Sequence, residues 1–516
     1  MPMDSTPKHF ASMDDLDPQQ SEAGAPRSDR GSSTIARSFV ALCIALLLVP
    51  FVAVPIVSAG ASAEKKELSA FPALQDENGF NYRYLSDLGS WFDDHFAFRS
   101  QLVDLDATIK EKLFLTSSTQ NVVVGQRGWL YYSGTLDDYR RSAPLSDRAI
   151  DNIAYNLQLI SAYLDAQGKG FVFTIAPNKA TLYPEQMPYY QLAGSGKSDL
   201  ERLVPLLEER GIPYVDLQSL FSSKTDKVYY FARDSHWNNE GALLAYDALM
   251  ASLNKDSLRF GESAPSSNVH SGDVDAMLHP YATSEEGQPF WPDSLSFTYT
   301  NGATSVEDSV IETSSTMDDA QGTVLVYRDS FGNALLPYLA STYDKGIFTK
   351  MVPYDMGMSY ISSADDIIME RAERHLSYFN SNPPYLPAPL RRSVTSWRTV
   401  SSSSTLRCSS NGPYLVIEGD LDRSFCEDGA PIYVALDLDG GGSPVFEAFH
   451  VGNVKDSVAD YADEDQGDSF VLTDYGFRAY VPMAALGDRD ALRARAVVPF
   501  GGEYLSIIEE ELSIGG

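Results

Sequence analysis

Positive charge is scarce in this chain. Its 516 residues hold 39 Lys and Arg against 71 Asp and Glu, which gives a formal net charge of −32 at pH 7. Binding to nucleic acid requires clustered Lys and Arg that neutralise phosphates. The composition therefore argues against nucleic acid as a partner, and the negative charge indicates a well-solvated surface.

Charge of either sign is absent from Ser38 to Ala63. Phe39 to Ala59 is long enough to cross a bilayer as one helix, and the polar composition of residues 1–37 before it predicts disorder. The pattern predicts a single-pass membrane anchor over 38–63, with residues 64–516 outside the cell. A removed signal peptide is the alternative, because small residues that suit cleavage end the stretch.

Cysteine is also rare, with three in the chain. Cys43 lies within the predicted span, which leaves Cys408 and Cys426 as the only cysteines of the predicted exported part. An oxidising compartment would let these two form a disulfide, and two free thiols are the alternative. No cysteine spacing typical of a metal site occurs, and no cofactor is expected.

After the predicted span, short apolar runs indicate where helices and strands lie. Helical spacing between residues 64 and 120 predicts a membrane-proximal helical region. From 121 to 385, strand-like runs alternate with helical stretches, and GFVFTIAP (170–177) is typical of a strand covered on both faces. The alternation predicts an α/β domain with a mostly parallel sheet flanked by helices.

Several segments depart from this alternation. Residues 256–320 are rich in Ser, Asp, Gly and Thr and form a long insertion, typical of a lid or binding surface, with disorder as the alternative. ERAERHLSYF (370–379) predicts a polar helix after the last strand of the sheet. Residues 386–404 have the composition of a linker, and strand-like runs over 405–516 predict a smaller antiparallel β domain.

A serine stands where an apolar run gives way to a helical pattern, in TVLVYRDSFGNALLPYLA (323–340). A strand that leads into a tight turn and then a helix is the geometry of a nucleophile elbow. The side chain at such a turn is exposed next to the free N–H groups of the helix. Ser330 occupies that position, and simple capping of the helix is its alternative role.

A serine nucleophile needs a base, usually a histidine oriented by a carboxylate. His236 follows a strand-like run, at the edge where loops of a parallel sheet converge, and Asp234 precedes it by two residues. The pattern predicts Ser330 as nucleophile, His236 as base and Asp234 as orienting carboxylate. The alternative is a polar turn in which Asn238 or Asn239 caps the next helix. No metal is expected here, because the further ligands of a metal motif are absent.

The predicted reaction also needs donors for an oxyanion. Backbone N–H groups at Ser330 and Phe331 are predicted to receive it. Asn178, which follows its strand, is a candidate side-chain donor. Arg328 and Trp237 are further candidates for contact with the oxyanion or the substrate.

Taken with their order, these blocks resemble the SGNH-hydrolase-like polysaccharide O-acetyltransferases of the AlgJ and AlgX type, over roughly residues 70–385. The matching motifs are DSHWNNEGA (234–242) and RDSFGNALLPYLA (328–340), with weaker similarity at GDVDAML (272–278) and DDIIMERAERHL (365–376). The resemblance implies an acyl-carrying serine and its histidine and aspartate in an exported or anchored enzyme. It also implies a multispanning membrane acyltransferase as the partner that supplies acetyl groups.

The sequence therefore predicts an extracellular, membrane-anchored O-acetyltransferase that acts on hydroxyls of a cell-surface or secreted polysaccharide. A polysaccharide acetyl esterase is the alternative, because both reactions need the same three residues. They differ in whether a sugar hydroxyl or water reaches the acyl-enzyme. A non-catalytic glycan-binding surface protein is a second alternative, favoured by Arg328, which stands where the wider SGNH pattern usually has Gly.

Overall fold

The computed structural model divides the chain into two compact units, Met1–Arg99 and Ser100–Gly516. The described residues are 36–45, 48, 69–76, 79–96, 98–224, 226–258, 266–291, 295–438, 443–454, 472–487 and 489–514. Most of the predicted span 38–63 lies outside them, although 36–45 are helical. Within these ranges, no helix is both long and apolar enough to cross a membrane.

In the first unit, the structure describes only a few short elements. A two-stranded ribbon of β1 (Gln75–Asp76) and β2 (Gly79–Phe80) precedes helix α2 (Tyr84–His95). Helix α3 (Arg99–Ile109) begins at the boundary of the units and continues as the π-helical turn η1 (Lys110–Phe114). These elements fall in the region where the sequence predicts helices.

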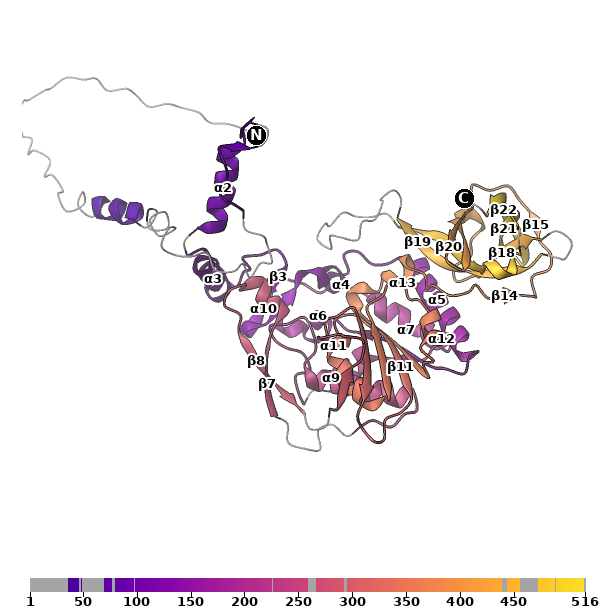
Figure 1. Ribbon diagram of the computed structural model, residues 1–516, viewed down its shortest axis with the longest axis horizontal. Helices are drawn as coiled ribbons and strands as arrows, with labels where there is room; N and C mark the ends of the chain where they lie inside the picture. Colours follow the sequence, from indigo (N-terminus) through magenta and orange to yellow (C-terminus); the bar gives the residue numbers. More distant parts are fainter. Residues whose placement is uncertain are drawn as a thin grey trace, which may run out of the picture. The chain divides into compact units, whose positions relative to one another are not determined.

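A seven-stranded sheet with the order β6-β5-β13-β11-β12-β10-β9 forms the centre of the second unit (Figure 1). Neighbours from β6 to β12 are parallel, and β10 and β9 are antiparallel. The predicted α/β fold with a mostly parallel sheet is confirmed. The strands are β5 (Gly170–Ala176), β6 (Tyr214–Val215), β9 (Phe297–Tyr299), β10 (Val310–Ser315), β11 (Thr323–Tyr327), β12 (Lys345–Thr349) and β13 (Asp366–Ala372).

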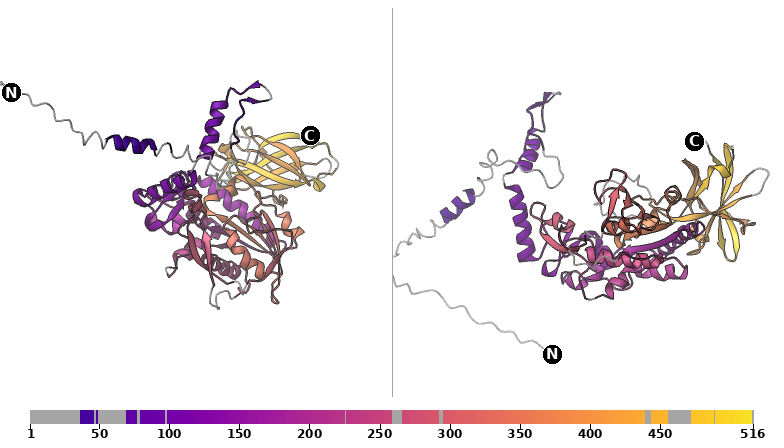
Figure 2. Two further views of the ribbon diagram at one scale, coloured as in Figure 1. Left: turned by 60° about the vertical axis from the view of Figure 1, so that its left-hand side comes forward. Right: turned by 60° about the horizontal axis from the view of Figure 1, so that its bottom comes forward.

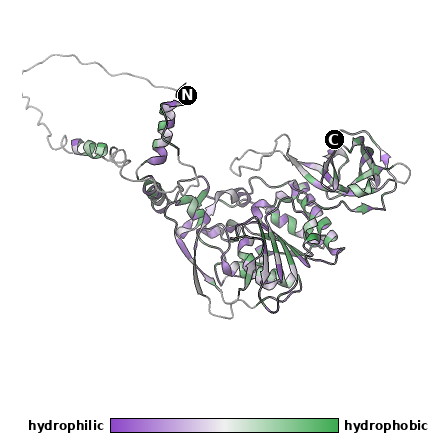
Figure 3. Cartoon of the chain, in the orientation of Figure 1, coloured by the Kyte–Doolittle hydropathy of each residue, from purple (hydrophilic) through white to green (hydrophobic). Residues whose placement is uncertain are grey.

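Helices cover both faces of this sheet (Figure 2), because its central strands have apolar side chains on both sides. Hydrophobic residues recur along these strands (Figure 3). In β5, Phe171 and Phe173 pack with α5 (Asp147–Asp165) and α7 (Asp199–Glu209). Val172, between them, packs on the other face with α9 (Asn239–Ser252) and α11 (Gly332–Thr342). Alternate side chains of a strand point to opposite faces, so one apolar run supplies both cores.

Shorter elements fill the connections. They are β3 (Val122–Val124), η2 (Gln126–Gly128), β4 (Leu130–Tyr132), η3 (Ser133–Thr135), α4 (Leu136–Arg140), α6 (Lys179–Leu182), η4 (Pro184–Gln186), α8 (Leu217–Ser222), β7 (Ser266–Ser271), α10 (Asp273–Leu278), β8 (Glu285–Phe290), α12 (Gly357–Ile361), η6 (Glu373–His375) and α13 (Tyr378–Ser381). The predicted insertion 256–320 thus contains the antiparallel pair β7–β8 and helix α10, and its β9 and β10 extend the central sheet.

The helix predicted over 370–379 is wrong at its start. Strand β13 continues to Ala372, where it pairs with Ala176 of β5, and all of its residues are buried. Pairing in the middle of the sheet overrides the helical preference of these polar residues. The chain then turns through η6 and α13, so the charged residues after Ala372 lie at the carboxyl edge of the sheet.

The C-terminal part forms a nine-stranded sheet, which confirms the smaller β domain. All its pairs are antiparallel except β15–β22. Strands β14 and β15 lie in the segment 386–404 that composition predicts as a linker. The strands are β14 (Leu390–Arg391), β15 (Arg398–Thr399), β16 (Arg407–Asn411), β17 (Tyr414–Asp420), β18 (Ile432–Asp437), β19 (Val445–Val454), β20 (Leu472–Pro482), β21 (Ala491–Phe500) and β22 (Glu503–Ser513), with the turns η7 (Arg423–Phe425) and η8 (Met483–Ala485).

Helix α5 joins the two domains through a buried polar contact. The Asn156 side chain donates to the backbone carbonyl of His450 at 2.9 Å and accepts from its N–H at 3.0 Å. Asn380 of α13 donates to Asp474 at 2.9 Å, and Phe449 of β19 belongs to the same apolar core as α5. The β domain is therefore packed against the α/β domain as well as connected to it in sequence.

The predicted disulfide is not formed. Cys408 and Cys426 are both free thiols. The Cys408 sulfur lies 3.3 Å from the carbonyl oxygen of Ser513, and that of Cys426 lies 3.5 Å from the carbonyl oxygen of Asp422. Each side chain is thus directed at a different backbone segment.

Candidate active site

The turn that carries Ser330 lies between the end of β11 and the start of α11. The buried Asp329 carboxylate holds this turn, since it accepts the N–H of Phe331 at 2.9 Å and that of Ala372, from the neighbouring strand β13, at 2.8 Å. Burial acts to raise the pKa of Asp329, but the hydrogen bond from His375 and nearby arginines hold it well below its usual range. Asp329 therefore remains ionised and fixes the serine turn to the sheet.

His236 and Asp234 face Ser330 from the loop before α9. The Ser330 Oγ lies 2.8 Å from His236 Nε2, and His236 Nδ1 lies 2.7 Å from Asp234 Oδ1. The Asp234 carboxylate also accepts the backbone N–H of His236 at 2.8 Å. The structure thus brings together the three predicted residues, in the order serine, histidine, carboxylate.

The run 228–231, expected as a strand, forms only a single bridge between Tyr230 and Trp237. Asn238 caps α9, as one alternative reading of this stretch predicts, because its side chain accepts the N–H of Gly241 at 3.0 Å. Capping of the helix and orientation of His236 therefore occur together. His236 lies in the turn that this bridge between Tyr230 and Trp237 closes.

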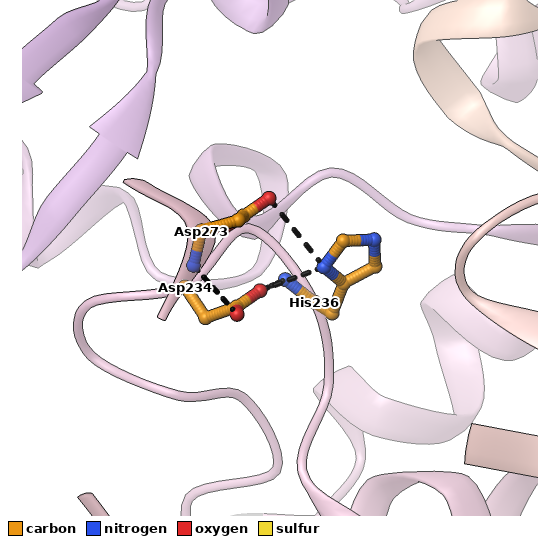
Figure 4. A group of neighbouring side chains, drawn as sticks. All are labelled: Asp234, His236 and Asp273. Carbon is orange, nitrogen blue, oxygen red and sulfur yellow. Dashed lines mark hydrogen bonds and ion pairs between the residues drawn. The ribbon is translucent and has the colours of Figure 1, made fainter. Parts of the chain in front are cut away.

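Two residues of the insertion complete the surroundings of Asp234, and sequence reasoning missed both. His270 Nε2 lies 2.7 Å from Asp234 Oδ2, and the backbone N–H of Asp273 donates to the same oxygen at 2.9 Å. The Asp273 carboxylate accepts from the N–H of Ser235 at 2.7 Å and lies 3.6 Å from His236 Nδ1 (Figure 4). The motif GDVDAML was the available sign, because Asp273 is its second residue.

The charges in this cluster raise the pKa of His236. Burial lowers the pKa of His236, but the hydrogen bond to Asp234 and the charges of Asp234 and Asp273 outweigh it and raise the pKa above its ordinary value. For Asp234, burial acts to raise the pKa, and the hydrogen bonds from His236 and His270 bring it well below its usual range. Asp234 is therefore ionised and fixes the His236 tautomer that leaves Nε2 free to accept a proton.

A buried lysine and a buried tryptophan hold the loop in place. Lys179, at the start of α6, donates to the carbonyl oxygens of Phe231 and Ala232 at 3.1 Å each. Burial lowers the pKa of Lys179 to about 8. Trp237, predicted as a substrate contact, is almost fully buried, and its Nε1–H donates to the carbonyl of Phe331 at 3.1 Å. Trp237 therefore ties the histidine loop to the serine turn.

Gly272 brings the insertion close to this loop, because a Cβ there would overlap the carbonyl group of Arg233. We expect Gly272→Ala to lower the free energy of unfolding by about 1–3 kcal/mol, the usual cost of overpacking. It should also slow any reaction at Ser330, since His270 and Asp273 must move away from Asp234. Urea denaturation measures the first effect. Gly287→Ala in β8 of the same insertion is the matched control, because open space surrounds that position; equal behaviour of both variants would contradict the close approach.

Two predicted oxyanion donors are engaged elsewhere. The side-chain amide of Asn178 donates to Asp138 Oδ2 at 2.8 Å, so it is directed away from Ser330. The Phe331 N–H donates to Asp329, as described above. Both assignments fail because a local carboxylate takes the hydrogen that the oxyanion would need. The Ser330 N–H, by contrast, has no acceptor within the described part of the chain.

Arg328, the departure from the wider SGNH pattern, is fully buried. Its Nη2 donates to the carbonyl oxygens of Val306 and Asp308 at 3.0 and 2.9 Å, and its Nη1 bonds to the side chain of Asn333. Burial lowers the pKa of Arg328. The guanidinium group therefore binds the insertion to the serine turn, and this is not the oxyanion position that the sequence offered.

We expect Arg328→Ala to lower the free energy of unfolding by about 3 kcal/mol, because it leaves two backbone carbonyls without their donor and opens a cavity. Urea denaturation measures this loss. Arg398→Ala is the control, because its exposed ion pair with Glu503 should contribute less than about 1 kcal/mol. If Arg328→Ala is as stable as the control and only the reaction is slower, Arg328 acts at the reacting atoms instead.

Two cavities meet at Ser330. The larger, of about 620 Å³, contains His236, Trp237 and His270 in its lining. The smaller, of about 540 Å³, has Lys350, Arg371, Arg374 and His375 in its lining, together with the carboxylates of Asp273 and Asp329. Ser330 is therefore accessible from two sides, one with its histidine and one with positive charge.

Three residues of this site form a group of potential metal ligands. Asp234, His236 and Asp273 have ligand atoms within 4.8 Å of one another (Figure 4). His236 Nδ1 and Asp234 Oδ1 share the 2.7 Å hydrogen bond. A cation bound through His236 Nδ1 would displace this hydrogen bond.

Fold and side chains together define the class of this domain. It is an α/β domain with a Ser-His-Asp arrangement at the carboxyl edge of its parallel sheet. In agreement, residues 122–348 match the family model described as "SGNH hydrolase-like domain, acetyltransferase AlgX". Residues 122–348 are thus similar to the AlgX acetyltransferase domain, which confirms the resemblance found in the motifs.

Relatives of known name agree with the family model. The chain is 26% identical over 220 residues to the probable alginate O-acetylase AlgJ of Pseudomonas aeruginosa, covering 41% of this chain and 55% of that protein. It is 26% identical over 252 residues to the AlgJ protein of Pseudomonas fluorescens, covering 47% of this chain and 61% of that protein. The match thus spans a little over half of the length of these relatives.

Solved structures give a more distant likeness. Pseudomonas aeruginosa AlgX has a TM-score of 0.33 and 16% identity, over 73% of this chain and 97% of that one. Bacillus cereus PatB1 has a TM-score of 0.38 and 16% identity, over 50% of this chain and 98% of that one.

Proposed function

We propose that this protein is an O-acetyltransferase that moves acetyl groups onto hydroxyls of a polysaccharide through an acetyl-Ser330 intermediate. One observation carries the proposal: Ser330 Oγ lies 2.8 Å from His236 Nε2, and the same ring lies 2.7 Å from Asp234. A serine hydroxyl is a weak nucleophile near neutral pH and needs a base at this distance.

The first half-reaction loads the serine. His236 Nε2 takes the proton of Ser330 as Oγ attacks the acetyl carbonyl, whose π electrons move onto its oxygen. When that pair returns, the bond to the donor alcohol breaks, and the imidazolium gives its proton to the leaving oxygen. The ionised Asp234 stabilises the imidazolium that forms between the two steps.

The second half-reaction unloads it. A sugar hydroxyl gives its proton to His236 and attacks the acetyl-serine carbonyl, and Ser330 leaves with that proton. Transfer is favoured over hydrolysis because the relatives in the curated set are named as alginate O-acetylases. A polysaccharide acetyl esterase is the second candidate, since water in place of the sugar hydroxyl uses the same groups.

The cellular setting is part of the proposal. The uncharged stretch 38–63 would anchor the chain with its catalytic domain outside the cell. Acetyl groups would then come from inside through a multispanning membrane acyltransferase, which is the expected partner.

The test uses the full-length chain and a small activated acetyl ester. Intact-mass measurement is expected to find a transient adduct of one acetyl group, located on the peptide that contains Ser330. Adding a candidate polysaccharide should then move the acetyl group onto the glycan. Release of all acetyl groups to water would favour the esterase, and a protein that binds glycan without forming any adduct would be the non-catalytic surface protein.

A further inference from the structure

Arg374 is a cation that lies beside Ser330 and forms no salt bridge within the described part of the chain, although its charge contributes to the low pKa of Asp329. It lies in η6, directly after β13, the strand next to the serine-bearing β11. No hydrogen bond or ion pair of its guanidinium occurs among the described residues. Instead, its Cζ lies 5.5 Å from the ring centroid of Phe331 and 5.8 Å from that of Tyr132. A positive charge held over two rings keeps its N–H donors available to a ligand.

The two cavities give Arg374 a defined position relative to the reaction. Ser330 and Arg374 line both cavities, whereas His236 lines only the larger one. The base must reach the attacking and leaving oxygens, so both of these lie on the side of His236. The carbonyl oxygen of the acetyl group then points away from the base, toward the basic side chains in the lining of the smaller cavity.

Several other donors near the turn are already engaged. Arg328 uses its Nη atoms on Val306, Asp308 and Asn333. Asn178 donates to an aspartate, and the N–H of Phe331 donates to another. Arg371 is buried beside the rings of Tyr354 and Tyr378, its Nη1 lies 3.5 Å from the carbonyl oxygen of Arg328, and its Nε has no hydrogen-bond partner among the described residues. Arg374 lines both cavities and Arg371 only the smaller one, so the guanidinium of Arg374 is the better-placed side-chain donor, next to the Ser330 N–H.

We propose that Arg374 is the side-chain donor of the oxyanion hole and that it acts together with the backbone N–H of Ser330. This inference rests on the proposed function. As Oγ bonds to the acetyl carbon, the carbonyl π pair becomes a negative charge on oxygen, and a guanidinium N–H binds that charge more strongly than the neutral carbonyl. When the pair returns and the leaving group departs, the charge disappears and the extra hydrogen-bond strength is lost. Arg374 thus stabilises the transition state more than the substrate.

The test measures how fast the full-length chain forms the acetyl adduct from a neutral activated ester in a single turnover. Arg374→Ala and Arg374→Gln are expected to lower the maximal rate by about 10²–10³-fold, with little change in the ester concentration at half-maximal rate. Guanidinium ion at millimolar concentration should restore part of the rate of Arg374→Ala. Arg398→Ala, an exposed arginine of the β domain, is the control and should keep the wild-type rate. The thermal midpoint of each variant checks folding.

The possible results distinguish a failure of the Arg374 role from a failure of the proposed acetyl transfer. If the wild-type chain forms no adduct, both are overturned. If the wild type reacts and Arg374→Ala reacts equally fast, only the role of Arg374 is overturned. A second ester that carries a carboxylate distinguishes oxyanion stabilisation from binding of an anionic substrate group. Loss of rate with that ester alone would mean that Arg374 binds an anionic group of the substrate, and this result would also overturn the oxyanion role.

Discussion

Replacing Ser330 by alanine is expected to abolish the acetyl adduct and to lower turnover of an activated acetyl ester by about 10⁴–10⁶-fold. The reason is the position of one atom. Ser330 Oγ is the atom that lies 2.8 Å from His236 Nε2, so its removal leaves the base with no proton to accept. Intact-mass measurement of the full-length chain after mixing with the ester detects the adduct, and release of the leaving group reports turnover.

Ser222→Ala supplies the matched control. This serine is exposed at the end of α8, so its loss should leave both readouts unchanged. An adduct of normal amount in Ser330→Ala would show that another nucleophile carries the acetyl group. The function proposed for the serine turn would then have to be abandoned.

His236→Ala is expected to slow acetylation of Ser330 by about 10⁴–10⁶-fold, because histidine and serine act as one unit in such sites. The dependence of the wild-type rate on pH adds a second signature. The pKa of His236 is raised above its ordinary value, although burial alone would lower it, because Asp234 bonds to the ring and carries a negative charge. A protonated Nε2 cannot accept the serine proton, so the rate should fall as pH drops through this raised pKa.

Single-turnover rates between about pH 5 and pH 9 test this point, since histidine is the side chain that titrates there. The variant His236→Ala should lose the fall at acidic pH as well as the rate. His95→Ala, in the first unit, should retain both features of the wild type. A normal rate in His236→Ala, or the same acidic limb in that variant, would assign the base to another residue.

The contacts of Arg328 change the interpretation of this residue. Seen in sequence, Arg328 replaces a glycine of the wider SGNH pattern and favours a site without chemistry. In the structure its guanidinium binds carbonyl groups of Val306 and Asp308, which belong to the insertion. The insertion also supplies His270 and Asp273 to the carboxylate of Asp234. Arg328 therefore binds the loop that completes the surroundings of Asp234, and Ser330 and His236 remain within hydrogen-bond distance.

Asp234 serves more groups than a simple orienting residue needs. Its two oxygens accept from His236 and His270 and from the N–H of Asp273. Each of these bonds favours the ionised carboxylate, which explains why the pKa of Asp234 is low despite burial. The insertion thus helps to maintain the negative charge that the imidazolium of His236 requires during each half-reaction.

The local pattern of the sequence determined the α/β class, the strand-turn-helix around Ser330 and the pairing of Asp234 with His236. These features depend on apolar periodicity and on residues two positions apart, which short-range chemistry fixes. Only the tertiary structure decided which donors near the serine are available. Asn178 and Phe331 lost that role to neighbouring carboxylates, and Cys408 and Cys426 lie on segments that do not bring their sulfurs together. Conversely, Arg374 gained a role because pairing of β13 to Ala372 carries it to the edge of the sheet. Such assignments depend on contacts between residues far apart in the chain, and neither propensity nor motif spacing encodes those contacts.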